Sequence, residues 1–496
     1  MNRFEKKCIT LFLSLFIMIS IQNNLVNAEN TFAQVVEGFD WGPCVTKMII
    51  HLDSQITVGS EEGILDESAF SVLTTMKVYI TNDDKQPIEV NIEQVRTVEK
   101  AYTSDEKGNY IKETTNYITL ELLCNPKIGN PFTYNLKTLV NEWSDPYTSV
   151  ITLTKDVTSG TTTLTSTDFS VNQQPTKNFN ILIDDVFTIN KTHTANDKTL
   201  TYGYYQCTNT TNKGLLIWIH GMGEGGTDNK IVLYGNRVTA LADTKIQTDL
   251  KNNCDILVVQ TPTFWLDLDK KGKEIYFPEI YTETFKSLVD KYVSENNIAE
   301  DRIYIGGCSM GGFMTMNMLL NYPYYFAAAY FAAEAYTDEY ISDEQIQSIK
   351  NIPMWFIHSE NDETVNISLH TNATYKRLQD AGATDLHYSH YDKVVDTSRK
   401  YDVDGAQYEY DGHWSWVYLF NDECKDGDET VFTWIVKQTN PNFVNESNAS
   451  NASNDSNASN DSNDSEKTIN VDDSESSLWF NKISTLFSLF IFILIF

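Results

Sequence analysis

Residues 302–313 read Arg302-Ile-Tyr-Ile-Gly-Gly-Cys-Ser-Met-Gly-Gly-Phe313, and this stretch decides the fold of the second half of the chain. An apolar β-type run breaks on glycines, and apolar residues with helical spacing follow. The order predicts a strand, a sharp turn and a helix. The turn spells G-x-S-x-G from Gly307 to Gly311, a pattern that holds a serine in a strained conformation with its hydroxyl exposed. A glycine-rich pentad can also be a plain loop, so the context decides.

The loop His220-Gly-Met-Gly-Glu-Gly-Gly226 directly follows an apolar strand pattern that ends at Ile219. A serine nucleophile needs two backbone N–H groups for the carbonyl oxygen, one after the serine and one from an early strand-to-helix loop. Met310 is the candidate after Ser309, and Gly221 and Met222 are the candidates in the loop. The alternative is a phosphate-binding loop, but a G-K-[ST] ending and dinucleotide spacing are both missing.

An acid and a base follow later in the chain. Asp362 stands in a polar loop after the apolar run from Trp355 to His358, where it could orient a histidine. His413 lies in Tyr410-Asp-Gly-His-Trp-Ser-Trp416 and can act as general base, because its unperturbed pKa is close to neutral. The order serine, acid, histidine, here Ser309, Asp362 and His413, is the one expected where a G-x-S-x-G turn carries the serine. The rival acids are Glu360, Glu363 and Asp385, and the rival bases are His387 and His390; His358 is interpreted as structural.

Strand patterns alternate with helical patterns from residue 181 to 440, which predicts an α/β domain with a mostly parallel sheet. The expected strands are Leu215 to Ile219, Ile256 to Gln260, Ile303 to Gly306, Ala327 to Phe331, Met354 to His358 and Leu386 to Tyr391. The expected helices are Tyr281 to Glu295, Phe313 to Asn321, Asp343 to Lys350, Thr371 to Ala381 and Thr430 to Gln438. Functional groups in such sheets gather at the carboxyl ends of the strands, where the motifs above fall.

Residues 31–180 instead alternate apolar and polar residues in short runs separated by turn signals. This pattern predicts an all-β sandwich of immunoglobulin size. It contains no catalytic constellation, and its expected role is to pack against the next domain or to shape access to it.

These motifs resemble those of secreted α/β-hydrolase esterases of the prolyl-oligopeptidase-like and polyhydroxybutyrate-depolymerase-like type. The resemblance rests on Gly307–Gly311, His220–Gly226, Asn361-Asp362 and Gly412–Trp416, and the segment Trp41–Asp53 is similar to the immunoglobulin-like N-terminal domain that some of them carry. It covers residues 31 to 439 and implies a serine carboxylesterase with Ser309, Asp362 and His413 as its triad. The implied substrates are short acyl esters, polyesters or esterified polysaccharides.

Two other functions stay open at this stage. One is a serine peptidase of prolyl-oligopeptidase type with the same triad, and the other is an inactive surface-binding protein. Four aromatic residues are candidates to line an acyl or sugar pocket: Trp265, Tyr276, Tyr336 and Trp414. Cys308, beside the serine, occupies a variable position of the pattern and is interpreted as a small buried residue.

Composition limits the partners. The 496 residues suffice for two or three domains, and a net charge of −31 argues against nucleic acid. Six cysteines remain if the first 28 residues are removed, so disulfides are permitted, but their pairing cannot be deduced from the sequence. The spacings typical of zinc sites are missing, and no cofactor or metal is expected.

Both ends of the chain resemble targeting signals. Residues 1–28 have basic residues, a short apolar run and a small-residue cleavage site, as in a secretory signal peptide. Residues 441–477 carry seven Asn-x-Ser sequons in a polar run that predicts a disordered stalk, and residues 478–496 resemble a signal for a glycolipid (GPI) anchor. A short tail anchor is the alternative. The sequence therefore predicts a glycoprotein that is secreted and tethered to the cell surface, with sequons also at Asn190, Asn209, Asn366 and Asn372; oligomeric state is left open.

Overall fold

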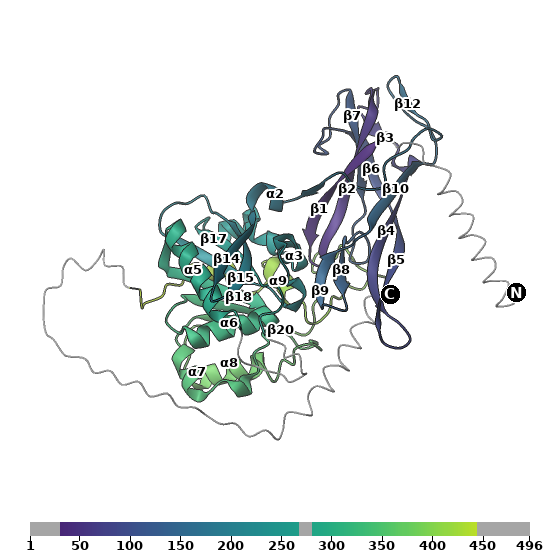
Figure 1. Ribbon diagram of the computed structural model, residues 1–496. Helices are drawn as coiled ribbons and strands as arrows, with labels where there is room; N and C mark the ends of the chain where they lie inside the picture. The colour runs from purple at the N-terminus through teal and green to yellow at the C-terminus, as the bar shows by residue number, and fades with distance from the viewer. Residues whose placement is uncertain (1–29, 267–279, 444–496) are drawn as a thin grey trace, which may run out of the picture.

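The computed structural model describes residues 30–266 and 280–443, which form two domains (Figure 1). The first domain is all β. Its larger sheet has the order β13 (Asn178–Asn180), β1 (Thr31–Phe39), β2 (Gly42–Ile56), β7 (Thr115–Leu122), β6 (Val98–Ser104) and β3 (Ile64–Leu65). Its smaller sheet has the order β10 (Tyr147–Leu153), β4 (Phe70–Thr81) and β5 (Pro87–Arg96). Two hairpins complete it: β8 (Phe132–Asn135) with β9 (Val140–Trp143), and β11 (Val157–Ser159) with β12 (Thr162–Leu164).

Alternation along the strands builds the core of this domain. Phe70 and Val72 of β4 are buried opposite Leu153 and Ile151 of β10, while the residues between them face outward. Each fully buried side chain of this kind contributes about 1.5–3 kcal/mol. A disulfide joins Cys44 of β2 to Cys124, just after β7. The pairing left open by the sequence is thus one bridge within the sandwich, whereas Cys207, Cys254, Cys308 and Cys424 are free and buried.

The second domain has an eight-stranded sheet. Its order is β14 (Thr188–Ala195), β15 (Lys198–Tyr205), β17 (Cys254–Gln260), β16 (Lys213–Ile219), β18 (Ile298–Cys308), β19 (Ala328–Ala332), β20 (Met354–Ser359) and β21 (Leu386–Tyr391). All neighbours from β17 to β21 are parallel, and β14 and β15 are antiparallel. The predicted mostly parallel sheet is therefore confirmed.

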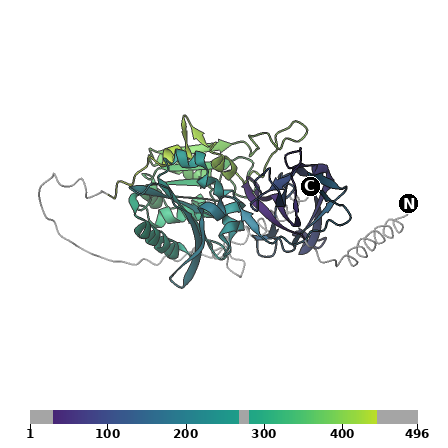
Figure 2. The same ribbon diagram turned by 90° about the horizontal axis from the view of Figure 1, so that it is seen from above.

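Helices cover both faces of this sheet (Figure 1 and Figure 2). The side chains of Leu215 and Ile217 in β16 pack with α5 (Thr282–Asn296), α6 (Met310–Asn321), α7 (Asp343–Ile349) and α8 (Thr371–Asp380). Those of Leu216 and Trp218 pack with α3 (Asn229–Gly235), α4 (Thr244–Asp249), α9 (Trp416–Phe420) and α10 (Val431–Ile435). Because β16 is buried along its whole length, it reads as a continuous apolar run.

The sequence located all six predicted strands and five predicted helices, but not the whole domain. It missed β14, β15, the two-residue strands β22 (Lys425–Asp426) and β23 (Glu429–Thr430), and the short helices α2 (Ile183–Val186), α3 and α4. It also extended the last helix to Gln438, although α10 ends at Ile435. Strand β14 has no buried residue, so it carries no apolar signal. The missed helices have four to seven residues, which is too short for a helical period to show.

The two domains share one continuous hydrophobic core and several polar contacts. The Tyr234 hydroxyl of α3 donates to the Val36 carbonyl, 2.9 Å away in β1. Arg237 pairs with Asp40 of the sandwich at 2.7 Å. Within residues 30–266 and 280–443, no helix is both long and apolar enough to cross a bilayer. The predicted signal peptide and C-terminal anchor, and nearly all of the predicted stalk, lie outside these residues.

Candidate active site

Ser309 lies between β18 and α6 in a strained backbone conformation. Its φ is 54° and its ψ is −119°, a combination that costs a non-glycine residue about 1–3 kcal/mol. The turn is this tight because its glycines pass very close to neighbouring backbone. A Cβ atom at Gly311 would lie 2.0 Å from the Ile219 carbonyl oxygen, and one at Gly307 would lie 2.4 Å from it. The predicted strand, turn and helix are thus present, with Ser309 half-buried at the carboxyl end of β18.

Asp362 and His413 lie in contact at the same edge of the sheet. His413 Nδ1 is hydrogen-bonded to Asp362 Oδ2 at 2.8 Å, and both residues are buried. The other carboxylate oxygen, Oδ1, accepts hydrogen bonds from the backbone N–H groups of Thr364 and Val365, each at 2.8 Å. The carboxylate is therefore fixed from both sides and directs the imidazole.

The charges of this pair favour an ionised acid beside a basic histidine. Burial alone would raise the pKa of Asp362, but the charges and hydrogen bonds of His413 and His358 hold it well below its usual range. Burial lowers the pKa of His413, yet the charge and hydrogen bond of Asp362 outweigh this effect and raise the pKa above its ordinary value. Asp362 thus stays ionised at neutral pH and stabilises a positive charge on His413.

His358 shares the same carboxylate. Its Nε2 lies 3.0 Å from Asp362 Oδ2 and its Nδ1 lies 2.8 Å from the Thr371 hydroxyl. The side chain is fully buried in β20. The sequence interpreted His358 as structural, and the structure places it as a second partner that holds Asp362 in position.

The rival residues lie in other pairs. His387 contacts Asp385 and Asp426, at 3.0 Å and 2.8 Å, and His390 pairs with Glu360 at 2.7 Å. Glu363 is exposed. Each candidate histidine therefore meets a candidate acid, but only the pair of Asp362 and His413 has both side chains buried.

The loop after β16 forms the 3-10 turn η2 (Met222–Glu224). The Thr261 N–H donates to His220 Nε2 at 3.2 Å, so His220 Nδ1 carries the proton that is donated to the Gly221 carbonyl. Burial lowers the pKa of His220 to about 4, which keeps this imidazole neutral. The Glu224 carboxylate lies against Gly221, where a Cβ atom would be 3.2 Å from Glu224 Oε2. Of the two loop candidates for an oxyanion donor, Gly221 is therefore the one that lies beside a carboxylate.

Two buried carboxyl groups near this edge were missed as functional candidates. Glu224 stands in the quoted glycine-rich loop, where an acidic residue after a buried strand was the available signal. Glu334 follows β19 and is fully buried; its Oε1 accepts from the Tyr336 N–H, and its Oε2 has no partner within the described residues. Burial raises the pKa of Glu334 well above its usual range.

The aromatic pocket candidates have different surroundings. Trp265 is fully buried and donates from Nε1 to the His220 carbonyl at 2.9 Å, so it packs beneath the loop. Tyr336 is buried and stacked on Phe313. Trp414 is half-buried, and Tyr276 lies outside the described residues.

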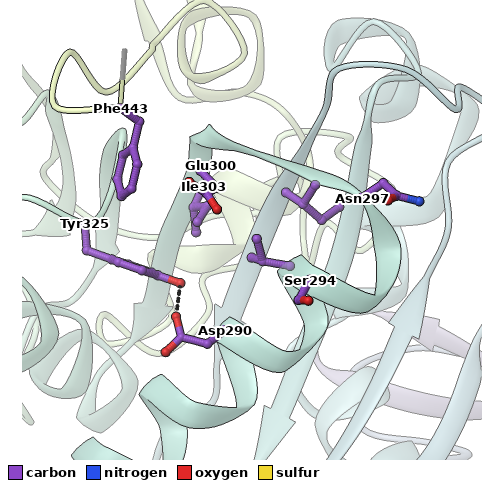
Figure 3. A pocket seen from close by; sticks show the side chains of 9 residues that line it. Asp290, Ser294, Asn297, Glu300, Ile303, Tyr325 and Phe443 are labelled. Atoms are coloured by element: carbon purple, nitrogen blue, oxygen red, sulfur yellow. Dashed lines mark hydrogen bonds between the residues drawn. The ribbon is translucent and has the colours of Figure 1, made fainter. Parts of the chain in front are cut away.

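A cavity of about 510 Å³ lies away from these residues (Figure 3). It is lined by α5 and the start of β18, together with Tyr325 and Phe443, and the Tyr325 hydroxyl donates to Asp290 at 2.7 Å. It therefore lies toward the amino ends of the parallel strands, whereas Ser309 follows a carboxyl end. In the described part of the chain, no three His, Cys, Asp or Glu residues are grouped as metal ligands.

A mostly parallel sheet with helices on both faces and a serine on a strand–turn–helix elbow defines an α/β-hydrolase. Residues 32–166 match the family described as "Esterase Ig-like N-terminal domain", and residues 204–400 match "Phospholipase/Carboxylesterase". The chain thus carries an esterase immunoglobulin-like domain in front of a domain that matches a phospholipase/carboxylesterase family. This finding confirms the resemblance and the fold class inferred from the sequence.

Solved structures agree with this fold. A structure titled "Crystal Structure of a Thermostable Esterase" is 23% identical with a TM-score of 0.62, and the match covers 84% of this chain and 100% of that one. A ferulic acid esterase is 12% identical with a TM-score of 0.36, covering 51% of this chain and 98% of that one, and we draw nothing from this weaker likeness. No curated protein matches the chain.

Proposed function

We propose that the protein is an extracellular serine carboxylesterase that hydrolyses carboxylic esters through Ser309, His413 and Asp362. The observation that carries this proposal is the buried hydrogen bond between His413 and Asp362 at the sheet edge where Ser309 lies on its strained turn. The match of residues 204–400 to a phospholipase/carboxylesterase family supports esters as the substrate class.

The reaction proceeds through an acyl-enzyme. Ser309 Oγ attacks the ester carbonyl carbon while His413 Nε2 takes its proton, because Nδ1 is held by Asp362. The tetrahedral intermediate expels the alcohol, which receives that proton from His413. Water then attacks the acyl-enzyme with His413 again as base, and the carboxylic acid leaves.

Backbone amides hold the oxyanion of each tetrahedral intermediate. Met310 is the first residue of α6 and Met222 is the first residue of η2, and amides at this position have no partner within their own helix. Gly221 was an equal candidate in the sequence, but it lies against the Glu224 carboxylate, whose negative charge would oppose an oxyanion there. We therefore assign the two donors to Met310 and Met222.

The proposed location is outside the cell, with the C-terminus as tether. The signal-like residues 1–28 and the anchor-like residues 478–496 support it. The Cys44–Cys124 disulfide also supports an oxidising compartment.

The test is hydrolysis of nitrophenyl acyl esters of increasing chain length, beside a matched peptide anilide, by the full chain and by Ser309→Ala. Ester turnover that falls by about 10⁴-fold or more in the variant is expected, since the nucleophile is lost. His390→Ala is the matched control, because this histidine lies in a separate pair with Glu360. Equal turnover of the anilide would establish a peptidase instead. A folded protein that neither turns over ester nor reacts with a fluorophosphonate would contradict the catalytic proposal.

A further inference from the structure

The N-terminal domain contacts the loop that we assign to oxyanion binding. The hairpin β8–β9 lies at the junction between the domains (Figure 1), and β9 packs against η2. Asn141 of β9 donates from Nδ2 to Glu224 Oε1, 3.2 Å away in the hydrolase domain. Glu224 is 6% exposed, so this contact joins the two domains beneath the surface.

Glu224 connects two otherwise separate backbone segments. Its carboxylate accepts from the Asn141 side chain and lies against Gly221, where a Cβ atom would be 3.2 Å from Glu224 Oε2. It also packs so tightly on the end of α3 that a Cβ at Gly235 would lie 2.8 Å from Glu224 Cγ. Met222, the proposed oxyanion donor, lies between the two loop residues that this contact joins.

The glycines of this loop lie so close to both domains that a side chain at these positions would collide with neighbouring atoms. A Cβ at Gly223 would lie 3.2 Å from Asn141 Nδ2, and a Cβ at Gly225 would lie 2.0 Å from the Thr263 carbonyl oxygen and 3.4 Å from Val140. The loop is therefore held between the hairpin of one domain and the body of the other. Rigid placement is what an oxyanion donor needs, because its stabilisation depends on a donor fixed before the charge develops.

We propose that Glu224 is a positioning residue for the oxyanion-binding loop, and that the N-terminal domain completes this device through Asn141. The inference rests on the proposed serine esterase function and deepens it. In this arrangement the immunoglobulin-like domain is part of the catalytic architecture, because a carboxylate that bridges its β9 to Gly221 sets the direction of the neighbouring Met222 amide.

The environment of Glu224 makes its positioning of the loop sensitive to pH. Burial raises its pKa to about 7, against the Asn141 and Gly221 hydrogen bonds and the charge of His413, which lower it. Tyr134 of β8 and Cys308 of β18 also face it. A protonated Glu224 carboxyl is a poorer hydrogen-bond acceptor than a carboxylate, so the loop is held best when Glu224 is ionised. His413 must also be unprotonated to act as base, so full activity requires loss of the proton from both groups.

Two variants test the proposal in the full chain. Glu224→Gln retains the size but places an amide NH₂ against one of the two donors, and Asn141→Leu removes the donor from the other domain. We expect kcat for a nitrophenyl ester to fall by about tenfold to a hundredfold with KM nearly unchanged, because an oxyanion donor acts in the transition state. The acid limb of log kcat/KM against pH should have a slope near 2 in the natural protein and near 1 in Glu224→Gln.

Trp143→Phe is the matched control. Trp143 lies on the same strand β9 and donates to Asp228 at 3.0 Å, an interdomain contact outside the Gly221–Glu224 loop. Its kcat and pH slope should stay within twofold of the natural values. Titration of the reactive serine with a fluorophosphonate counts the folded sites in every variant.

The outcomes separate this inference from the proposed function. Unchanged kcat per titrated serine in Glu224→Gln and Asn141→Leu would overturn the positioning role, as would a loss of activity that only follows the number of titrated sites. An unchanged Ser309→Ala enzyme would instead overturn the esterase mechanism itself.

Discussion

The hydrolase sheet buries a charged cluster at each end, and the two clusters differ in what their partners can do. At the amino ends of β16 and β17, the Asp255 carboxylate pairs with Lys213 at 2.7 Å and accepts from the Tyr292 hydroxyl at 3.1 Å and the Cys207 N–H at 3.1 Å. Every partner is fixed on the strands, on α5 or just after β15, and none is a histidine.

At the carboxyl ends, Asp362 is equally buried and equally well satisfied. Two of its partners, however, are histidines, and one of them stands on the loop before α9 at the edge that carries Ser309. Burial and pairing alone therefore do not mark a catalytic site. The distinguishing feature is a histidine partner at the edge of the sheet that carries the proposed nucleophile Ser309.

Among the variants that test this difference between the two clusters, Asp362→Asn should have the largest effect on activity. Loss of the carboxylate removes the charge that stabilises protonated His413, so kcat should fall by about 10⁴-fold. The pH profile should also move. Asp362 is the main group that raises the pKa of His413, with Asp411 and Glu224 as smaller contributors, while burial lowers that pKa. In the natural protein, activity should fall as the pH drops through the pKa values of His413 and Glu224, and in Asp362→Asn the part of this limb that belongs to His413 should shift to lower pH.

Measurement of kcat/KM from pH 4 to 9 for both proteins checks this prediction. An acid limb that keeps both its position and its slope, or moves to higher pH, would show that His413 does not contribute to it.

The amino-end cluster should respond in stability and not in rate. Lys213→Met leaves the Asp255 charge buried without its partner, which costs about 3–5 kcal/mol. Denaturant unfolding should show this loss, while turnover per titrated serine stays within twofold, since no catalytic candidate contacts Lys213. The double variant Lys213→Met with Asp255→Leu should recover most of the loss, because no uncompensated charge remains. Reduced turnover per site in the single variant would show that the two ends are coupled.

The same contrast explains which features could be predicted from the sequence. The elbow, the loop after β16 and the positions of Asp362 and His413 could be located, because each is a short motif beside an apolar strand and parallel strands bring their carboxyl ends together. The edge strand β14 gave no comparable signal, since it is polar and has no buried residue.

Contacts between segments that are far apart in the sequence could not be predicted. Asn141 and Glu224 are 83 residues apart and lie in different domains, so neither residue type alone indicated their contact. The Cys44–Cys124 bridge spans 80 residues and was one of several possible pairings. The identity of Asp362 as the carboxylate that meets His413 depended on the turn after β20, which the sequence allowed but did not require.

The smallest expected effect concerns the backbone strain at Ser309. Ser309→Ala and Ser309→Gly both lack the nucleophile, but only glycine adopts a φ of 54° with a ψ of −119° without steric cost. Relief of about 1–3 kcal/mol of strain, offset by the greater freedom of glycine in the unfolded chain, should make Ser309→Gly more stable than Ser309→Ala by about 1 kcal/mol. Gly382, also at positive φ but in open space, is the comparison site: Gly382→Ala should lower stability by a similar amount without changing turnover. If the two Ser309 variants unfold at the same denaturant concentration, the backbone at Ser309 is not strained. The free energy of unfolding would then not be lowered by the conformation of this turn.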